Sequence, residues 1–300
     1  MVEPVRLQSV AIAGRERPNL LILGGVHGDE FESMAAIRRL KACLEPSVLR
    51  GCVTLVPVVN EAAYWRGQRT ADDGLDLART CPGSQEGSLT ERIAYAVSQL
   101  ILKADYLIDL HSGGITMTCA PLVGYMLHPD PATLERQRRM ARAFNLPIIW
   151  GTTPHLDGRT LSIARDIPIP AIYTEWMGGG ACDPVGVDRY VEGCLNVMAE
   201  LGMIDRPAPE SCLEHFVEDA RENSGHLQLN YPSPFSGFFE PAVHLKERVH
   251  PGDLIGWVTD HLGGHREEIR SKQGGVVLVL RVYSRVHEGD SLAAVLETDG

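Results

Sequence analysis

Two histidines and one glutamate in this chain of 300 residues have the types and spacing of metal ligands. His27 and Glu30 stand in the segment Gly-Gly-Val-His-Gly-Asp-Glu, and His111 stands in Asp-Leu-His-Ser-Gly-Gly. Two imidazoles and one carboxylate form a ligand set that holds a catalytic zinc ion and leaves a fourth position open for water. The sequence therefore predicts one zinc ion per chain and hydrolytic chemistry.

The pattern His-x-x-Glu is not informative by itself, because it also begins at His215, His244 and His265. Only the copy at His27 follows an apolar run, residues 20–23, that is typical of a buried parallel strand and precedes a helical pattern. Open α/β sheets bind their ligands at the carboxyl ends of such strands. We interpret the other three copies as solvated polar residues.

His111 follows a second predicted strand, residues 105–110, where that strand runs out into serine and glycine. A lone histidine at this place would more often be a hydrogen-bonded structural residue, but its pairing with the first motif favours a metal ligand. Asp109 lies on the same side of the strand, so it could orient a ligand imidazole. A buried acid that accepts hydrogen bonds from the backbone is an equal alternative for Asp109.

A further predicted strand, residues 167–174, leads to Glu175 and then to three glycines at 178–180. Metal-assisted hydrolysis of an amide needs a group that takes a proton from water and returns one to the leaving amine. Because it follows a strand end, Glu175 is the candidate for this task.

Asn60 follows the predicted strand 53–59 and begins a predicted polar loop that contains Arg66, Arg69 and Arg79. Guanidinium groups bind carboxylates through paired hydrogen bonds. Asn60, Arg69 and Arg79 are therefore the candidate substrate-binding residues. The alternative is surface arginines that pair with nearby acids, which we favour for Arg66; these acids are Asp72, Asp73 and Asp76.

The order and spacing of these segments resemble the succinylglutamate desuccinylase/aspartoacylase family, whose members are relatives of the zinc carboxypeptidases. The likeness rests on the two histidine motifs, on Asn60 and Arg69, on Asp76-Leu77-Ala78-Arg79, and on Glu175 before a glycine run. The resemblance implies that His27, Glu30 and His111 bind zinc. It also implies that Glu175 is the catalytic carboxylate and that Arg69 and Arg79 bind the substrate carboxylate.

One position departs from the family pattern, because Ala78 stands where the family commonly has asparagine in Asp-Leu-Asn-Arg. An amide that would help to hold the substrate carboxylate is missing, so the substrate differs at that end or a neighbouring group substitutes. The stretch Arg79-Thr-Cys-Pro-Gly, with the segment 87–92, is closer to a subgroup that includes N-acetyl-diaminobutyrate deacetylases.

We therefore predict a zinc-dependent amidohydrolase that removes an acyl group from a small N-acyl amino acid. Two alternatives stay open. A zinc carboxypeptidase would use the same metal but accept peptides, and a non-catalytic metal-binding protein could be built on the same scaffold, with Ala78 as a first sign of lost activity.

Predicted helices and strands alternate through residue 203, which indicates a mixed α/β sheet with helices on both faces; the resemblance makes this sheet zinc-carboxypeptidase-like. After residues 207–209, short apolar runs separated by Gly-Asp or Gly-Gly indicate an all-β unit similar to a barrel-sandwich domain. We predict a zinc-dependent catalytic domain over 1–208 and a C-terminal β domain over 209–300. A carrier role for such a domain would need a lysine at the tip of the hairpin near residues 261–265, and none is there. This domain is therefore expected to shape the active-site entrance or a subunit contact.

Composition restricts the partners and the cellular compartment. The net charge of −11 argues against nucleic acid or an anionic membrane surface as a partner. No signal-like N-terminus and no run of about 18 apolar residues is present, so a cytoplasmic location is expected. Seven cysteines without a Cys-x-x-Cys pair predict reduced, mostly buried thiols. The expected partner is a small anionic substrate, and a homo-oligomer is compatible with the sequence.

Overall fold

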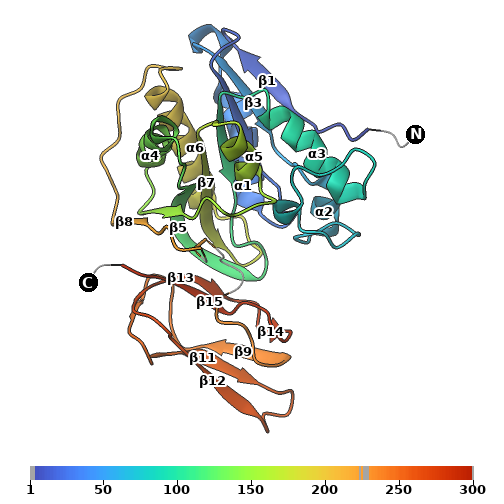
Figure 1. The fold of residues 1–300 in the computed structure, drawn as a ribbon, viewed down its shortest axis with the longest axis vertical. Coiled ribbons are helices and arrows are strands. Elements are labelled where there is room, and N and C mark those ends of the chain that lie inside the picture. The colour runs from blue at the N-terminus through green and yellow to red at the C-terminus, as the bar shows by residue number, and fades with distance from the viewer. Residues whose placement is uncertain (1–3, 223, 226–229, 299–300) are drawn as a thin grey trace.

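The computed structural model describes residues 4–222, 224–225 and 230–298. These residues form a mixed sheet of eleven strands with helices on both faces, and a second sheet of four antiparallel strands (Figure 1). The predicted α/β sheet with an additional β unit is therefore confirmed. None of the described helices is both long enough and apolar enough to cross a membrane.

The centre of the large sheet consists of four parallel strands, in the order β3, β2, β4, β7. Each of them contains a run of apolar residues that is buried in the sheet. Their carboxyl ends lie at one edge, where open α/β sheets bind ligands. The bounds are Asn19–Leu23 for β2, Cys52–Val56 for β3, Tyr106–Leu110 for β4 and Ala171–Gly178 for β7.

Strand β5, Met117–Met126, joins the early and late parts of the chain. It runs antiparallel to β7, pairs with β6 through its second half, and pairs with β13 through its first half. Because β8 pairs with β6, strands after residue 208 extend the sheet that earlier strands form. The division at residue 208 stays a prediction. The remaining strands of this sheet are β1 (Val10–Ala13), β6 (Ile148–Thr152), β8 (His215–Glu218), β10 (Arg248–Val249), β13 (Gly275–Arg281) and β15 (Ala293–Leu296).

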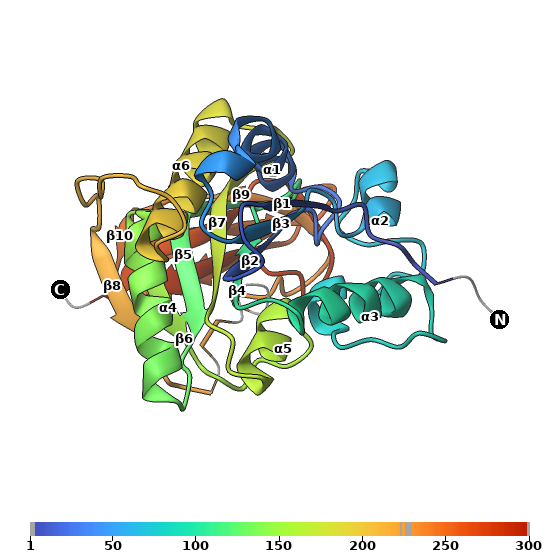
Figure 2. The same cartoon turned by 90° about the horizontal axis from the view of Figure 1, so that it is seen from above.

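Helices α1, α4 and α6 pack together on one face of the sheet, and α3 and α5 cover the other (Figure 2). Ile37, Phe144 and Tyr190 belong to the core under the first group, and Ile93 and Leu161 to the core under the second. The bounds are Phe31–Cys43 for α1, Leu89–Ile101 for α3, Pro131–Phe144 for α4, Thr160–Asp166 for α5 and Pro184–Glu200 for α6.

The starts of α3 and α4 follow signals that the sequence contains. Ser88 and Glu91 form a capping box at α3, in which each side chain bonds to the other residue's backbone N–H. Pro131 occupies the first turn of α4, where a missing N–H costs nothing, and Asp130 caps that helix.

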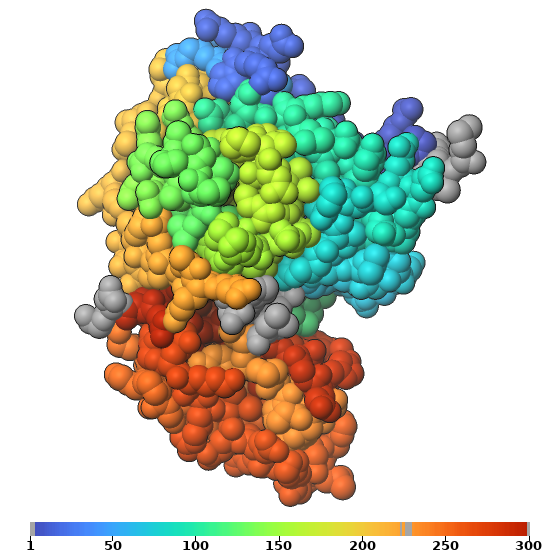
Figure 3. All heavy atoms as spheres, in the orientation of Figure 1, coloured from blue at the N-terminus to red at the C-terminus, as the bar shows by residue number. Residues whose placement is uncertain are grey.

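The four-stranded sheet has its own apolar core, which includes Phe239, Ile255 and Val258. Strands β13 and β15 contribute to this core and also pack against β5 through Leu278 and Ala294. In the space-filling view the late residues form a distinct lobe beside the larger body (Figure 3). The bounds are Gly237–Pro241 for β9, Leu254–Thr259 for β11, Arg266–Arg270 for β12 and Arg285–Val286 for β14.

Two local predictions around the site were wrong. Glu175 does not follow the end of its strand, because β7 continues to Gly178 and pairs with β5 opposite Glu175. The segment after Asn60 is not a loop throughout, since it contains helix α2, Glu61–Arg66, and a 3₁₀ turn, Leu77–Arg79. The end of β7 is ordered by its pairing with β5, which is distant in the sequence, whereas α2 begins at a local N-cap, Asn60.

The cysteines are free, as predicted, and all seven lie within the described residues. The expectation that most are buried was wrong, because only Cys81, Cys119 and Cys194 are buried. The apolar runs around a cysteine do not reveal which strand edge or loop exposes it.

Candidate active site

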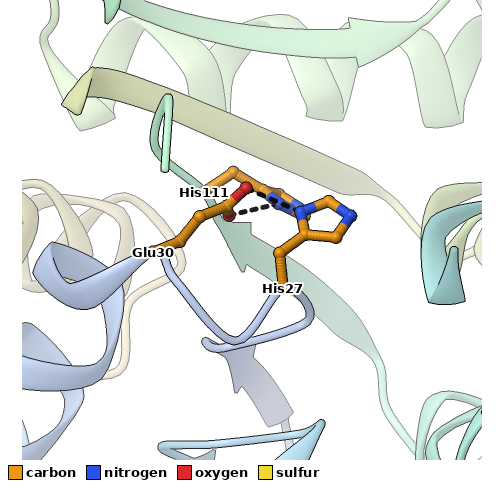
Figure 4. Close-up of side chains that lie close together, drawn as sticks. All are labelled: His27, Glu30 and His111. Carbon is orange, nitrogen blue, oxygen red and sulfur yellow. Dashed lines mark hydrogen bonds and ion pairs between the residues drawn. The ribbon is translucent and has the colours of Figure 1, made fainter. Parts of the chain in front are cut away.

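The three predicted ligands meet at the carboxyl edge of the parallel strands. His27 and Glu30 lie in the loop between β2 and α1, and His111 directly follows β4. Since β2 and β4 are adjacent and parallel, their following loops lie side by side. The three ligand atoms lie within 4.8 Å of one another and all three residues are buried (Figure 4).

The carboxylate of Glu30 lies between the two imidazoles. Its Oε1 is 2.6 Å from Nδ1 of His27, and its Oε2 is 2.9 Å from Nδ1 of His111. The backbone N–H of Ser112 also donates to Oε2, at 3.2 Å. Burial opposes ionisation of Glu30, but charge and hydrogen bonds from the two histidines hold its pKa well below the ordinary value.

A further carboxylate contacts the other nitrogen of each imidazole. Oδ1 of Asp76 is 3.1 Å from Nε2 of His27, and Oδ2 of Asp109 is 3.2 Å from Nε2 of His111. Such contacts fix the tautomer of a metal-binding histidine and direct its other nitrogen to the metal. The hydroxyl of Thr160 donates to Asp109 and holds it in place. Asp109 thus lies where the sequence suggested, whereas the position of Asp76 was not anticipated.

The donor set fits zinc. Two imidazole nitrogens and one carboxylate oxygen converge, which is a known arrangement of three protein ligands at catalytic zinc. Calcium and magnesium prefer sites made of oxygen ligands. Glu30, Asp76 and Asp109 also surround the two imidazoles with three carboxylates, so a divalent cation would offset the negative charge gathered here.

Glu175 lies on the wall of the cavity that contains this cluster. The residue is partly exposed, but its Oε2 is enclosed and has no hydrogen-bond partner among the described residues. Burial, and after it the negative charge of Glu30, raises the pKa of Glu175 to about 8. A carboxyl group that titrates near neutral pH can both accept and return a proton.

Arg69 and Arg79 both line the cavity, but their surroundings differ. Nε and Nη2 of Arg69 donate to Oδ2 of Asp76 at 3.2 and 3.0 Å, and Nη1 lies 3.7 Å from Oε1 of Glu30. Arg79 is exposed, and its Nη1 donates to the carbonyl of Ala78 at 2.7 Å. Arg69 is therefore tied to the acidic cluster, whereas Arg79 carries no carboxylate partner within 4.0 Å among the described residues.

Asn60 is not among the described residues that line the cavity. It is fully buried, and its Oδ1 accepts the backbone N–H of Ala63 at 3.1 Å as the N-cap of α2. Arg66 forms an ion pair with Asp72, which is the surface pairing that we favoured for it.

Arg159 and Tyr173 are among the cavity residues that the sequence analysis missed. Among the described residues, Nη1 and Nη2 of Arg159 make only long contacts, 3.5 and 3.4 Å, with the carbonyl of Gly225. Burial, with the charge of Arg79, lowers the pKa of Arg159 to about 10. Tyr173 shares a face of β7 with Glu175, so strand spacing could have found it. Arg159 precedes α5 and carries no comparable pattern.

The glycine at position 124 explains how Tyr173 reaches the cavity wall. These two residues are paired in the β5–β7 ladder. A Cβ atom added at Gly124 would lie 2.1 Å from the Tyr173 ring, so the ring passes across the strand where no side chain blocks it. Apolar side chains complete the wall at Met126, Leu156 and Leu161.

The family model for the succinylglutamate desuccinylase/aspartoacylase catalytic domain matches residues 16–201. The chain belongs to this family. It is 31% identical over 289 residues to N-alpha-acetyl-L-2,4-diaminobutyric acid deacetylase of Halomonas elongata, covering 94% of this chain and 83% of that protein. The resemblance predicted from the motifs is confirmed.

Two solved structures show the same fold. The succinylglutamate desuccinylase/aspartoacylase from Rhodobacter sphaeroides is 27% identical, with a TM-score of 0.86 and coverage of 97% of this chain and 89% of that one. The product-bound ectoine utilization protein EutE (DoeB) from Ruegeria pomeroyi is 26% identical, with a TM-score of 0.87 and coverage of 96% and 87%. Family and relatives together support deacylation of an N-acyl amino acid by this member of the succinylglutamate desuccinylase/aspartoacylase family.

Proposed function

We propose that this chain is a zinc-dependent amidohydrolase that deacylates a small N-acyl amino acid. The observation that carries the proposal is the single cavity that holds the His27–Glu30–His111 cluster together with Glu175 and Arg79. The substrate that we favour is Nα-acetyl-2,4-diaminobutyrate, because the Halomonas relative is named for its deacetylation.

In this proposal His27, Glu30 and His111 hold the zinc ion. When bound, zinc would lower the pKa of water toward ~7 and stabilise negative charge that develops on the acyl oxygen. Asp76 and Asp109 position the two imidazoles through their Nε2 atoms, since each lies within 3.2 Å of one of them.

Glu175 acts as the general base and then as the general acid. It accepts a proton from the attacking water and donates one to the nitrogen of the leaving amino acid. The burial that raises its pKa to about 8 suits both steps, because a strongly acidic carboxyl group would bind the proton too weakly to return it to an amine.

Arg79 and Arg159 hold the substrate carboxylate. Arg79 is exposed and lines the cavity, and Arg159 has only long contacts, with Gly225, among the described residues, so both guanidinium groups can direct N–H donors to an anion. Arg159 can also substitute for the amide that is missing at Ala78. Asn60, which we predicted to bind substrate, would instead order the segment that leads to Arg69 by capping α2.

The test is release of a primary amine from a panel of N-acyl amino acids and short peptides, with Glu175→Gln as the blank. We expect Nα-acetyl-2,4-diaminobutyrate to yield acetate and the free amino acid, and peptides to react poorly. Preferred cleavage of C-terminal residues from peptides would favour a zinc carboxypeptidase. Metal binding without release of an amine from either the N-acyl amino acids or the peptides would favour the non-catalytic alternative.

A further inference from the structure

Asp29 lies between two of the proposed metal ligands in the sequence, and the metal site does not explain its carboxylate. The residue is 6% exposed and lines the cavity. Its Oδ2 accepts the backbone N–H of Ile115 at 3.0 Å. Its Oδ1 is buried and has no hydrogen-bond partner among the residues that the structure describes. A buried carboxylate oxygen without a donor is costly, so a bound molecule that brings a donor would be favoured.

The surroundings of Asp29 restrict its movement. A Cβ atom added at Gly114 would lie 2.6 Å from Oδ2, so the carboxylate packs closely against this loop. Arg69 acts on Asp29 through its charge, and its Nε and Nη2 donate to Asp76. The protein therefore holds one oxygen of Asp29 in place and supplies no donor to the other among the described residues.

The cavity presents binding groups of both charges. Arg79 and Arg159 offer guanidinium groups to an anion, while Asp29 offers a carboxylate oxygen to a cation. A ligand that carries one carboxylate and one ammonium group would satisfy both. An ammonium that is transferred into such a cavity needs a charged partner, because an unpaired buried charge is strongly disfavoured.

We propose that Asp29 recognises a side-chain ammonium group of the substrate and thereby selects N-acyl diamino acids over N-acyl amino acids with neutral side chains. This inference rests on the proposed deacylase function. An ammonium would donate a charge-assisted hydrogen bond to Oδ1, which is stronger than a bond between neutral groups. A site with a polar group that only the correct substrate satisfies rejects an isostere that lacks the donor.

The test compares Nα-acetyl-2,4-diaminobutyrate with Nα-acetylnorvaline, in which a methyl group replaces the ammonium at the same position. The variant is Asp29→Asn, which keeps the size of the side chain and an oxygen that can accept from Ile115. The matched control is Asp188→Asn, which removes an exposed carboxylate that pairs with Arg39 outside the cavity. Zinc content and thermal unfolding show whether each variant is intact.

We expect wild type to prefer the diamino substrate, and Asp29→Asn to lower kcat/KM for that substrate by about tenfold or more. The value for the norvaline substrate should change by less than about twofold, and Asp188→Asn should change neither. Equal losses on both substrates would overturn the inference, because Asp29 would then act only through Ile115. Absence of a preference in wild type would overturn it without any variant.

Calorimetric binding of 2,4-diaminobutyrate and of norvaline separates this inference from the proposed function. If wild type hydrolyses neither substrate, the proposed function fails. The inference about Asp29 survives that result only if wild type binds 2,4-diaminobutyrate more tightly than norvaline and Asp29→Asn removes the difference. Equal binding of the two amino acids by wild type overturns it.

Discussion

Nδ1 of His111 lies 2.9 Å from Oε2 of Glu30, although 81 residues separate them in the chain. The contact exists because β2 and β4 are neighbouring parallel strands, so that the loops that follow them meet. The pairing of these strands therefore brings the ligands together. A ligand side chain can be replaced to test its role while the sheet is kept.

Replacement of His111 by alanine should abolish stoichiometric zinc binding, because it leaves one imidazole and one carboxylate. Zinc content after dialysis, measured by elemental analysis, checks this. His244→Ala is the matched control, since His244 begins another His-x-x-Glu copy but is exposed and is not among the described residues that line the cavity. One tightly held zinc ion in the His111 variant would contradict the ligand assignment.

Glu175→Gln should retain zinc and lower kcat by ~10²–10⁴, the usual contribution of a positioned general acid or base. Glutamine keeps the size of the side chain but cannot transfer the proton. Steady-state kinetics and zinc content are measured on the same preparation. Near-normal turnover would place the base elsewhere, and Asp109 would be the next residue to test.

Arg79→Met should raise KM and lower kcat/KM for a free-acid substrate while leaving the poor activity on the matching amide almost unchanged. The guanidinium forms its paired hydrogen bonds only when the substrate anion is present. Kinetics on the acid and the amide check this, with Arg66→Met as control because Arg66 pairs with Asp72. Equal losses on both substrates would mean that Arg79 has a structural role.

The ionisation of Glu218 should make the free energy of unfolding depend on pH in the acidic range. Hydrogen bonds from Arg138, opposed by burial, lower its pKa below the ordinary 4.5. The pair therefore stabilises the fold above the unfolded-state pKa, and this contribution is lost as the pH falls through the folded-state pKa. Glu218→Gln should lower Tm near neutral pH, and this difference should shrink as the pH falls below the ordinary pKa of 4.5. A difference that does not change with pH would exclude this ionisation as the cause, and Glu288→Gln, at an exposed residue, is the control.

Glu218 also shows a contact that the motif alone does not predict. The copy of His-x-x-Glu at His215 was interpreted as solvated, and Glu218 is exposed, but its Oε1 also accepts the Tyr125 hydroxyl at 2.6 Å. The partners come from β5 and α4, and nothing in residues 215–218 reveals that these elements are near. His244 and His265 are exposed, so the interpretation holds for those two histidines.

The sequence was most informative where a local pattern coincides with a strand or a helix end. The apolar run before His27 and the one before His111 became β2 and β4, and the capping box became the start of α3. Asp76, Arg159 and Asp29 could not be assigned in this way. Their roles depend on which loops the fold brings to one cavity, and single charged residues in loops carry no periodicity.

The central claim is that one zinc ion at the His27–Glu30–His111 cluster supports deacylation with Glu175. The most direct measurement titrates zinc into metal-free protein and follows acetate release from Nα-acetyl-2,4-diaminobutyrate. We predict that activity rises with added zinc and reaches a plateau at one equivalent per chain, with acetate and free amino acid formed in equal amounts. Full activity without metal, or a zinc-loaded protein that releases no acyl group from any N-acyl amino acid, would contradict the claim.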